Sequence, residues 1–243
     1  VDWRHQFVDM PSYTVRNSSN ANNTDVQLCK PAMGYSFAAG TTDGPGAFNF
    51  KQGTTTSNPF WNAISHLIAT PSAEDIACQH PKPILLATGD TDKPYDWDPA
   101  VVDTQIFRIG QLFILAVPAE FTTMSGRRIR DSVKAQLIRD GAADENAIVV
   151  IAGLSNTYAS YITTFEEYQI QRYEGASTVF GPHSLEAYQQ QFGILASAMA
   201  TGAAVPPGPS PPDLSSQQIS LLPPVIADST PSGKNFGDVL TQP

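Results

Sequence analysis

Basic residues are scarce in this chain of 243 residues, which has 14 lysines and arginines against 23 aspartates and glutamates. The resulting net charge of −9 argues against a nucleic-acid partner and against electrostatic docking on anionic lipid, because both require clustered positive charge. Charged residues of either sign make up only 15% of the chain. Its length still allows a substantial hydrophobic core, so we expect a folded, acidic protein with no nucleic-acid partner.

Long apolar runs and common catalytic motifs are also missing. No stretch is apolar for long enough to span a bilayer, and the chain shows neither a signal peptide nor an initiating methionine. It has no Gly-x-Ser-x-Gly, His-Glu-x-x-His or Cys-x-x-Cys motif and no phosphate loop. The histidines are scattered and are expected to be structural: His5, His66, His80 and His183. The opening segment VDWRHQFVDM is typical of a domain interior, so we expect residues 1–243 to be a piece of a longer polypeptide.

Cysteine is almost absent, since only Cys29 and Cys78 occur. A bond between them would close a long loop, and such bonds persist in oxidising compartments. Asn17 and Asn22 begin two N-glycosylation sequons in one polar stretch. Two buried free thiols and two chance sequons are the alternative. A secreted or extracellular location explains all of these features together, and we predict a Cys29–Cys78 disulfide and glycans on Asn17 and Asn22.

The strongest pattern in the chain is a strand–helix–strand unit. Leu112–Val117 and Ala147–Ala152 are short β-branched runs without polar alternation, as expected of strands that are covered on both faces. Between them, a helix is predicted over about 123–140, because its apolar residues recur at i, i+4 and i+8: Ile129, Val133 and Leu137. A βαβ unit places its strands parallel, so we expect an α/β fold with a mixed sheet and flanking helices.

Polar residues follow both strands of this unit. Glu120 comes just after the first strand, and Asn156, Tyr158 and Tyr161 come after the second. Ligands of open α/β sheets bind at the carboxyl ends of the strands, so we expect the site there. Glu120 could ligate a metal, act as a base or merely cap the following helix, and the tyrosines could simply pack. These alternatives stay open on the residues alone.

The remaining segments complete the expected fold with long Gly- and Pro-rich loops. Residues 31–53 are too rich in glycine for a regular helix, and they could approach a ligand or merely pack against the sheet. Ser184–Ala200 is predicted to be an amphipathic helix. Residues 205–213 are predicted to be a Pro-rich linker or surface strap.

Several long motifs of the sequence resemble those of the neutral ceramidase family. The resemblance rests on AVPAEFTTMSGRRIR (116–130), on GLSNTYASYITTFEEYQIQRYEGASTVFGPHSLEAYQQQF (153–192) and on GYSFAAGTTDGPGAFNFKQG (34–53). PKPILL (81–86) and SGKNFGDVL (232–240) extend it over nearly the whole chain. Members of this family are zinc-dependent amidases that hydrolyse ceramide to sphingosine and fatty acid.

The resemblance implies roles for three residues. The family's zinc-binding glutamate falls on Glu120, which follows Ala119 where glycine is common, and its zinc-binding tyrosine falls on Tyr161. A further tyrosine, which polarises the substrate carbonyl or holds the oxyanion, falls on Tyr173. The two histidine ligands belong to the preceding half of the family's catalytic domain. Residues 1–243 are therefore expected to be the C-terminal portion of that domain, without the domain that follows and without a complete site.

The partners implied are a ceramide-type lipid and the missing N-terminal half, with the membrane surface met only transiently through the substrate. Two other hypotheses compete with the zinc amidase. A metal-independent hydrolase, such as a glycosidase, would pair Glu120 with Glu166 or Glu167. A non-catalytic binding or structural fragment would use Glu120 and the tyrosines only for capping and packing.

Overall fold

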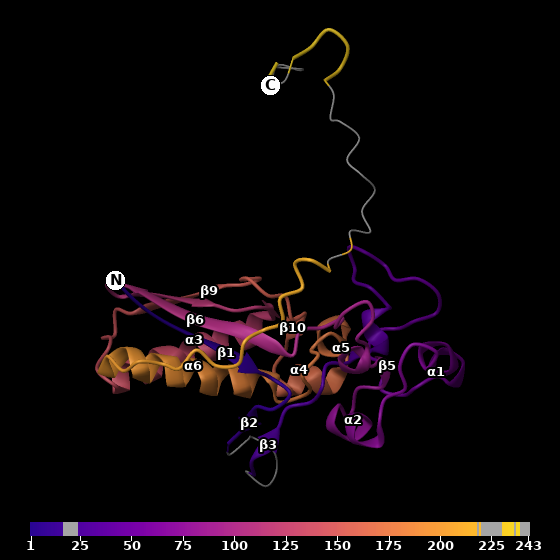
Figure 1. Cartoon of the computed structure of the whole chain (residues 1–243), viewed down its shortest axis with the longest axis horizontal. Coiled ribbons are helices and arrows are strands. Elements are labelled where there is room, and N and C mark those ends of the chain that lie inside the picture. Colours follow the sequence, from indigo (N-terminus) through magenta and orange to yellow (C-terminus); the bar gives the residue numbers. More distant parts are fainter. Residues whose placement is uncertain (17–23, 218, 220–229, 236, 239–243) are drawn as a thin grey trace. The chain divides into compact units, whose positions relative to one another are not determined.

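The computed structural model describes residues 1–16, 24–217, 219, 230–235 and 237–238. The chain divides into two units, Val1–Pro212 and Asp213–Pro243. The described residues of the second unit form turns, with no helix or strand among them. Every element named below belongs to the first unit (Figure 1).

The fold is built on a four-stranded mixed sheet with the order β1-β6-β7-β9. These strands are β1 (Asp2–Asp9), β6 (Val101–Ile109), β7 (Leu112–Ala116) and β9 (Ile148–Ala152). β1 and β6 are antiparallel, as are β6 and β7, whereas β7 and β9 are parallel. The predicted parallel pair and mixed α/β sheet are therefore confirmed, and β6, which the sequence analysis did not assign, lies at the centre.

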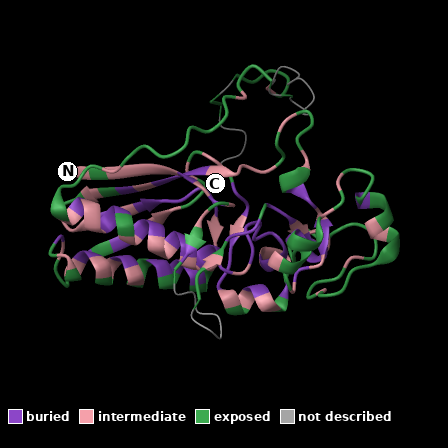
Figure 2. Cartoon of the chain, turned by 60° about the horizontal axis from the view of Figure 1, so that its bottom comes forward, coloured by how far each residue is buried: buried purple, intermediate pink, exposed green. Residues whose placement is uncertain are grey.

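Two long helices cover one face of this sheet. α3 (Thr123–Arg139) connects β7 and β9 as predicted, and α6 (Ser184–Thr201) packs beside it (Figure 1). The apolar stripes predicted on both helices are buried: Ile129, Val133 and Leu137 on α3, and Leu185, Tyr188, Phe192, Leu195 and Met199 on α6. Figure 2 shows the buried residues concentrated on the sheet and on these helices, while the loops are mostly exposed. This layer forms the core.

The other face of the sheet is open, so the prediction that both faces of β7 and β9 are covered is wrong for this chain. Trp3, Phe107, Ile114 and Val150 are register partners across the four strands and therefore share one face. Trp3, Phe107 and Val150 are all exposed. No described helix lies on that side.

The Pro-rich segment runs along the outer edge of β1 as a strap. Pro207 O accepts a hydrogen bond from the backbone N–H of Phe7 at 2.8 Å, and Pro206 O accepts one from the Gln6 side chain. Gly208 comes so close to Phe7 O that a Cβ would lie 1.9 Å from that oxygen. Its φ of +79° also favours glycine.

Smaller elements surround this frame. The minor strands are β2 (Thr14–Val15), β3 (Val26–Gln27), β4 (Met33–Gly34), β5 (Ile84–Leu86), β8 (Glu120–Phe121) and β10 (Tyr161–Ile162). The short helices are α1 (Pro59–Ser65), α2 (Ala73–Cys78), α4 (Phe165–Ile170), α5 (Tyr173–Ala176), and the 3-10 turns η1 (Tyr35–Phe37) and η2 (Thr88–Asp90). Residues 31–53 contain no α-helix, as expected. No described helix is long and apolar enough to cross a membrane.

Candidate functional site

A two-stranded parallel ribbon places the expected metal ligands side by side. β8 follows β7 directly, and the loop after β9 returns so that β10 pairs with β8, with Glu120 and Tyr161 as register partners. Glu120 N donates to Ser160 O at 2.9 Å, and Thr122 N donates to Ile162 O at 3.1 Å. The expectation that the Tyr-rich segment folds back over the sheet edge is confirmed.

Three non-glycine residues with positive φ bend this returning loop. Leu154, Asn156 and Ser160 have φ values of 55°, 60° and 56°. Residues other than glycine rarely adopt this left-handed backbone conformation, and those that do are concentrated at functional sites. The loop they shape delivers Tyr158 and Tyr161 to Glu120.

The three side chains meet in an aromatic and carboxylate cluster. The Tyr158 hydroxyl donates to Glu120 Oε1 at 2.8 Å. The Tyr161 ring lies edge-on to the Tyr173 ring, with centroids 5.5 Å apart. The Phe37 ring lies next to the Tyr173 ring, with centroids 6.1 Å apart, so the Gly-rich segment also reaches the site. The structure thus gathers Glu120, Tyr161 and Tyr173, and it brings Tyr158, which the sequence analysis expected at this edge without a chemical role, to the Glu120 carboxylate.

The electrostatics of the cluster keep the phenols of Tyr158 and Tyr161 protonated. Partial burial raises the pKa of both Tyr158 and Tyr161, and hydrogen bonding to Glu120 together with its negative charge raises each pKa further. Both hydroxyls are therefore neutral donors at pH 7 in the absence of a cation.

A pocket of about 570 Å³ opens beside this cluster. Glu120 and Tyr161 line it together with Glu167, Glu174 and Arg172. Three carboxylates against one guanidinium make the pocket net negative, which suits a cation. A larger depression of about 1180 Å³ lies along β1 and α6, but none of the expected site residues lines it.

Glu120 does not cap α3, so that alternative is wrong. The cap is Thr122, whose side chain accepts from Ser125 N. Glu120 instead lies in β8, two residues before the cap, where its carboxylate is available to the pocket.

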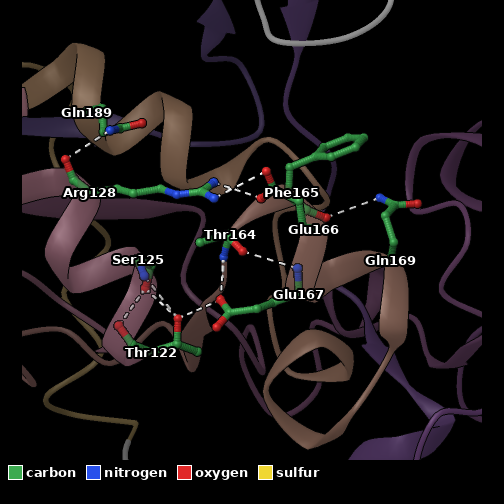
Figure 3. Close-up of polar contacts among 9 residues, drawn as sticks. All are labelled: Thr122, Ser125, Arg128, Thr164, Phe165, Glu166, Glu167, Gln169 and Gln189. Carbon is green, nitrogen blue, oxygen red and sulfur yellow. Dashed lines mark hydrogen bonds and ion pairs between the residues drawn. The ribbon is translucent and has the colours of Figure 1, made fainter.

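Glu167 fastens the starts of α3 and α4 to each other (Figure 3). Its Oε2 accepts from the Thr122 hydroxyl at 2.7 Å and from Thr164 N at 2.8 Å. The Thr164 hydroxyl oxygen in turn accepts a hydrogen bond from Glu167 N at 3.1 Å, which completes a capping box on α4. Because Thr122 and Thr164 follow β8 and β10, these bonds hold the two ribbon strands in register.

Glu166 has a separate role at the surface. Its carboxylate binds Arg128 through two hydrogen bonds, the shorter at 2.7 Å, and its side chain is 66% exposed. Glu166 and Glu167, which the glycosidase-like hypothesis would pair with Glu120, are therefore both engaged in hydrogen bonds that stabilise the fold.

The donor set of the site fits part of a zinc site. Carboxylate oxygen and phenol oxygen are zinc ligands, and a dication would reverse the effect of Glu120 on the Tyr161 pKa. Zinc needs about four ligands, however, and the described residues contain no group of three or more His, Cys, Asp or Glu that could hold a metal. The described residues therefore offer two candidate ligands at this place, Glu120 and Tyr161.

The predicted disulfide is present. Cys29 and Cys78 are bonded, and the bond ties the end of α2 to the segment that precedes β4. His80 and His183 line a separate pocket beside it, away from Glu120. The predicted glycosylation sites, Asn17 and Asn22, lie outside the described residues.

Comparison with known proteins identifies the family. The N-terminal model of neutral/alkaline non-lysosomal ceramidase matches residues 1–190, and the C-terminal model of the same family matches residues 192–243. The chain belongs to the neutral/alkaline ceramidase family. It is 55% identical to neutral ceramidase 3 of Arabidopsis thaliana and 54% identical to neutral ceramidase of Oryza sativa subsp. japonica, covering 98% of this chain in each case.

Solved ceramidases share the fold. A structure described as ceramidase complexed with C2 superposes with a TM-score of 0.74 at 42% identity over 99% of this chain. The crystal structure of neutral ceramidase from Pseudomonas aeruginosa gives 0.72 at 40% identity. The chain spans about a third of the length of these ceramidase relatives, 33% in the first case and 36% of the first solved chain.

Proposed function

We propose that this chain supplies part of a zinc-dependent active site that hydrolyses the amide bond of ceramide to give sphingosine and a fatty acid. The observation that carries the proposal is the register pairing of Glu120 with Tyr161 on the edge of a net negative pocket, in a chain of the ceramidase family. Residues of paired parallel strands lie about 4.8 Å apart, so both side chains can reach one ion.

Each residue has a distinct part in this proposal. Glu120 and Tyr161 hold the metal, and Tyr158 fixes the Glu120 carboxylate through Oε1, which leaves Oε2 for the ion. Zinc, when bound, polarises the amide carbonyl and lowers the pKa of water. Tyr173, held against the Tyr161 ring, donates its hydroxyl proton in a hydrogen bond to the oxygen that becomes negative as the amide carbon turns tetrahedral.

The test uses the intact polypeptide that contains this chain. Glu120→Gln and Tyr161→Phe should lose bound zinc, measured by elemental analysis, together with amidase activity. Tyr173→Phe should keep zinc and lower kcat, because its bond forms mainly in the transition state. Residues 1–243 alone should be inactive, with two ligands where zinc needs four. Full activity of the Glu120→Gln enzyme, or of the chain alone, would overturn the assignment.

We also propose that the protein works in a secretory or extracellular compartment. The Cys29–Cys78 disulfide supports this, because such bonds persist in oxidising surroundings. The test is to express the intact polypeptide with its natural targeting sequence and look for it in the medium. A protein retained in the cytosol with both thiols alkylatable would contradict the proposal.

A further inference from the structure

A buried carboxyl group lies at the edge of the sheet where the candidate site forms. Asp103 of β6 is only 4% exposed. Gln105 is the register partner of Ala116, the last residue of β7, so Asp103 lies two positions beyond that end of β7. The chain leaves β7 at this end and enters β8, so Asp103 lies on the side of the sheet that carries Glu120.

Asp103 is an unfavourable residue at this place if only stability is considered. Its Oδ2 accepts hydrogen bonds from the side-chain amide of Gln105, at 2.9 Å, and from that of Asn156. Its Oδ1 is buried and has no hydrogen-bond partner among the described residues. A buried carboxylate costs free energy when its oxygens are incompletely bonded, and such exceptions are expected at functional sites. The partner that leads toward the site is Asn156.

Asn156 lies in the returning loop, residues 154–160, which joins β9 to β10. Its φ of +60° is left-handed, a conformation that asparagine adopts more readily than most residues. Its side-chain bond to Asp103 attaches the loop to β6, and at the other end the ribbon of β8 and β10 holds the chain. Tyr158 lies between these two attachments, so the path of the chain between them decides where its hydroxyl points.

We propose that Asp103 is a positioning residue that acts through Asn156. The bond between their side chains fixes the returning loop, so that Tyr158 donates to Glu120 and β10 stays in register with β8. Asp103 itself does not line the pocket beside Glu120. The inference rests on the proposed function only for its consequence at the metal, because the contact that fixes the loop is independent of zinc.

Two simpler explanations predict different behaviour. In the first, Asp103 only supports the fold, as its neighbour Thr104 does on the opposite face of β6 by accepting a hydrogen bond from Gln191. In the second, Asn156 only supplies a left-handed backbone, as Leu154 does with a φ of 55° in the same loop. Thr104→Val and Leu154→Gly are therefore the matched controls.

Hydrogen–deuterium exchange of the intact polypeptide, read by peptide mass spectrometry, tests the contact. Asn156→Gly removes the amide at an exposed position and leaves the left-handed backbone accessible. We expect residues 154–160 to exchange about tenfold faster in this variant, because a hydrogen bond to a charged group is lost. Leu154→Gly should change this rate by less than about threefold, and Thr104→Val should lower the urea midpoint without changing it. Equal rates in Asn156→Gly and Leu154→Gly would overturn the proposal.

The two partners must also act through one bond. Asp103→Ala should accelerate the exchange of residues 154–160 as Asn156→Gly does. The double variant should exceed the Asn156→Gly rate by less than about twofold, because both substitutions remove the same contact. Effects that multiply in the double variant would show that the two side chains act separately, and would overturn the proposal.

The consequence at the metal is measured separately. In the intact enzyme, Asn156→Gly should weaken zinc binding about tenfold, as the loss of a bond behind a metal ligand typically does, while Leu154→Gly and Thr104→Val keep the parental affinity. Where Glu120→Gln loses zinc, parental affinity of Asn156→Gly together with accelerated exchange would overturn the positioning role. Where Glu120→Gln keeps zinc, the proposed function fails, and the exchange rates alone decide whether the contact fixes the loop.

Discussion

Removal of the Tyr158 hydroxyl should weaken zinc binding without disturbing the fold. In the structure this hydroxyl donates to Glu120 Oε1 at 2.8 Å and fixes the orientation of the carboxylate. The Tyr158→Phe substitution keeps the ring and deletes only the donor. Glu120 is then free to rotate, and binding a metal must restrict it again.

The expected magnitude follows from the type of bond and its exposure. Hydrogen bonds to charged groups contribute about 1.5–3 kcal/mol. Tyr158 is 49% exposed, so water replaces part of the lost donor and the effect lies near the lower end. A loss of about 1.4 kcal/mol corresponds to roughly tenfold weaker zinc binding. Loss of a hydrogen-bond partner behind a metal ligand typically costs 10- to 100-fold in affinity, which agrees.

The assay is competition for zinc between the intact polypeptide and a chelator of known affinity. Tyr168→Phe is the matched control, because the buried Tyr168 hydroxyl donates to Gln79 and contacts no site residue. It should lower stability by about 1–3 kcal/mol and leave zinc affinity unchanged. The reasoning is refuted if Tyr158→Phe binds zinc as tightly as the parent while Glu120→Gln does not.

Three further predictions concern stability, measured by urea unfolding of the intact polypeptide. Glu167→Ala should lower the free energy of unfolding by about 2–3 kcal/mol, because it removes the carboxylate that bonds to both Thr122 and Thr164. The control Glu166→Ala breaks only an exposed ion pair and should cost less than about 1 kcal/mol. Equal losses for the two variants would contradict the capping role of Glu167. Replacing Cys29 and Cys78 together by alanine should cost roughly 4 kcal/mol, as expected for a sequence separation of 49, and no change would refute the bond. Burial lowers the pKa of Lys82 in the folded chain well below 10.5, so the unfolded chain binds one more proton at pH values between the two pKa values. The free energy of unfolding should therefore rise as the pH increases toward 10.5. A Lys82→Met variant whose stability rises equally steeply with pH would count against this.

The sequence predicts the elements with strong periodicity. α3 carries a clean apolar stripe and begins and ends close to the predicted 123–140, and α6 matches its predicted range closely. The β7–β9 pair was recognisable because both strands are uniformly apolar. In each case the pattern is long or extreme enough to override other signals.

β6 was missed because its buried face is not uniformly apolar. Thr104 lies on that face between Val102 and Ile106, and its hydroxyl accepts a hydrogen bond from the Gln191 side chain. The bond satisfies a polar group in the core, but it removes the alternation that marks a strand. The same hydroxyl donates to Gln6 O on β1 at 3.0 Å, so contacts with both α6 and β1 explain why a threonine is tolerated there.

The site was located but not resolved by sequence. Glu120 and Tyr161 lie in strands of two residues each, too short for any periodic signal. Their roles as metal ligands, and that of Tyr173, stay predictions. The sequence does carry one local signal beside the site, because Thr164 and Glu167 form the Thr-x-x-Glu capping box that starts α4. The contact of Tyr158 with Glu120 depends on left-handed loop residues that the sequence does not specify.

The Pro-rich strap has a consequence for aggregation. An outer strand such as β1 presents unpaired backbone groups that can recruit a strand from another molecule. Pro207 accepts the Phe7 N–H, but Pro206 and Pro207 have no N–H to donate, so the strap occupies this edge without forming a new one. β9, at the opposite end of the sheet order, has no such strap among the described residues. Self-association of the chain through strand pairing should therefore begin at β9 rather than at β1.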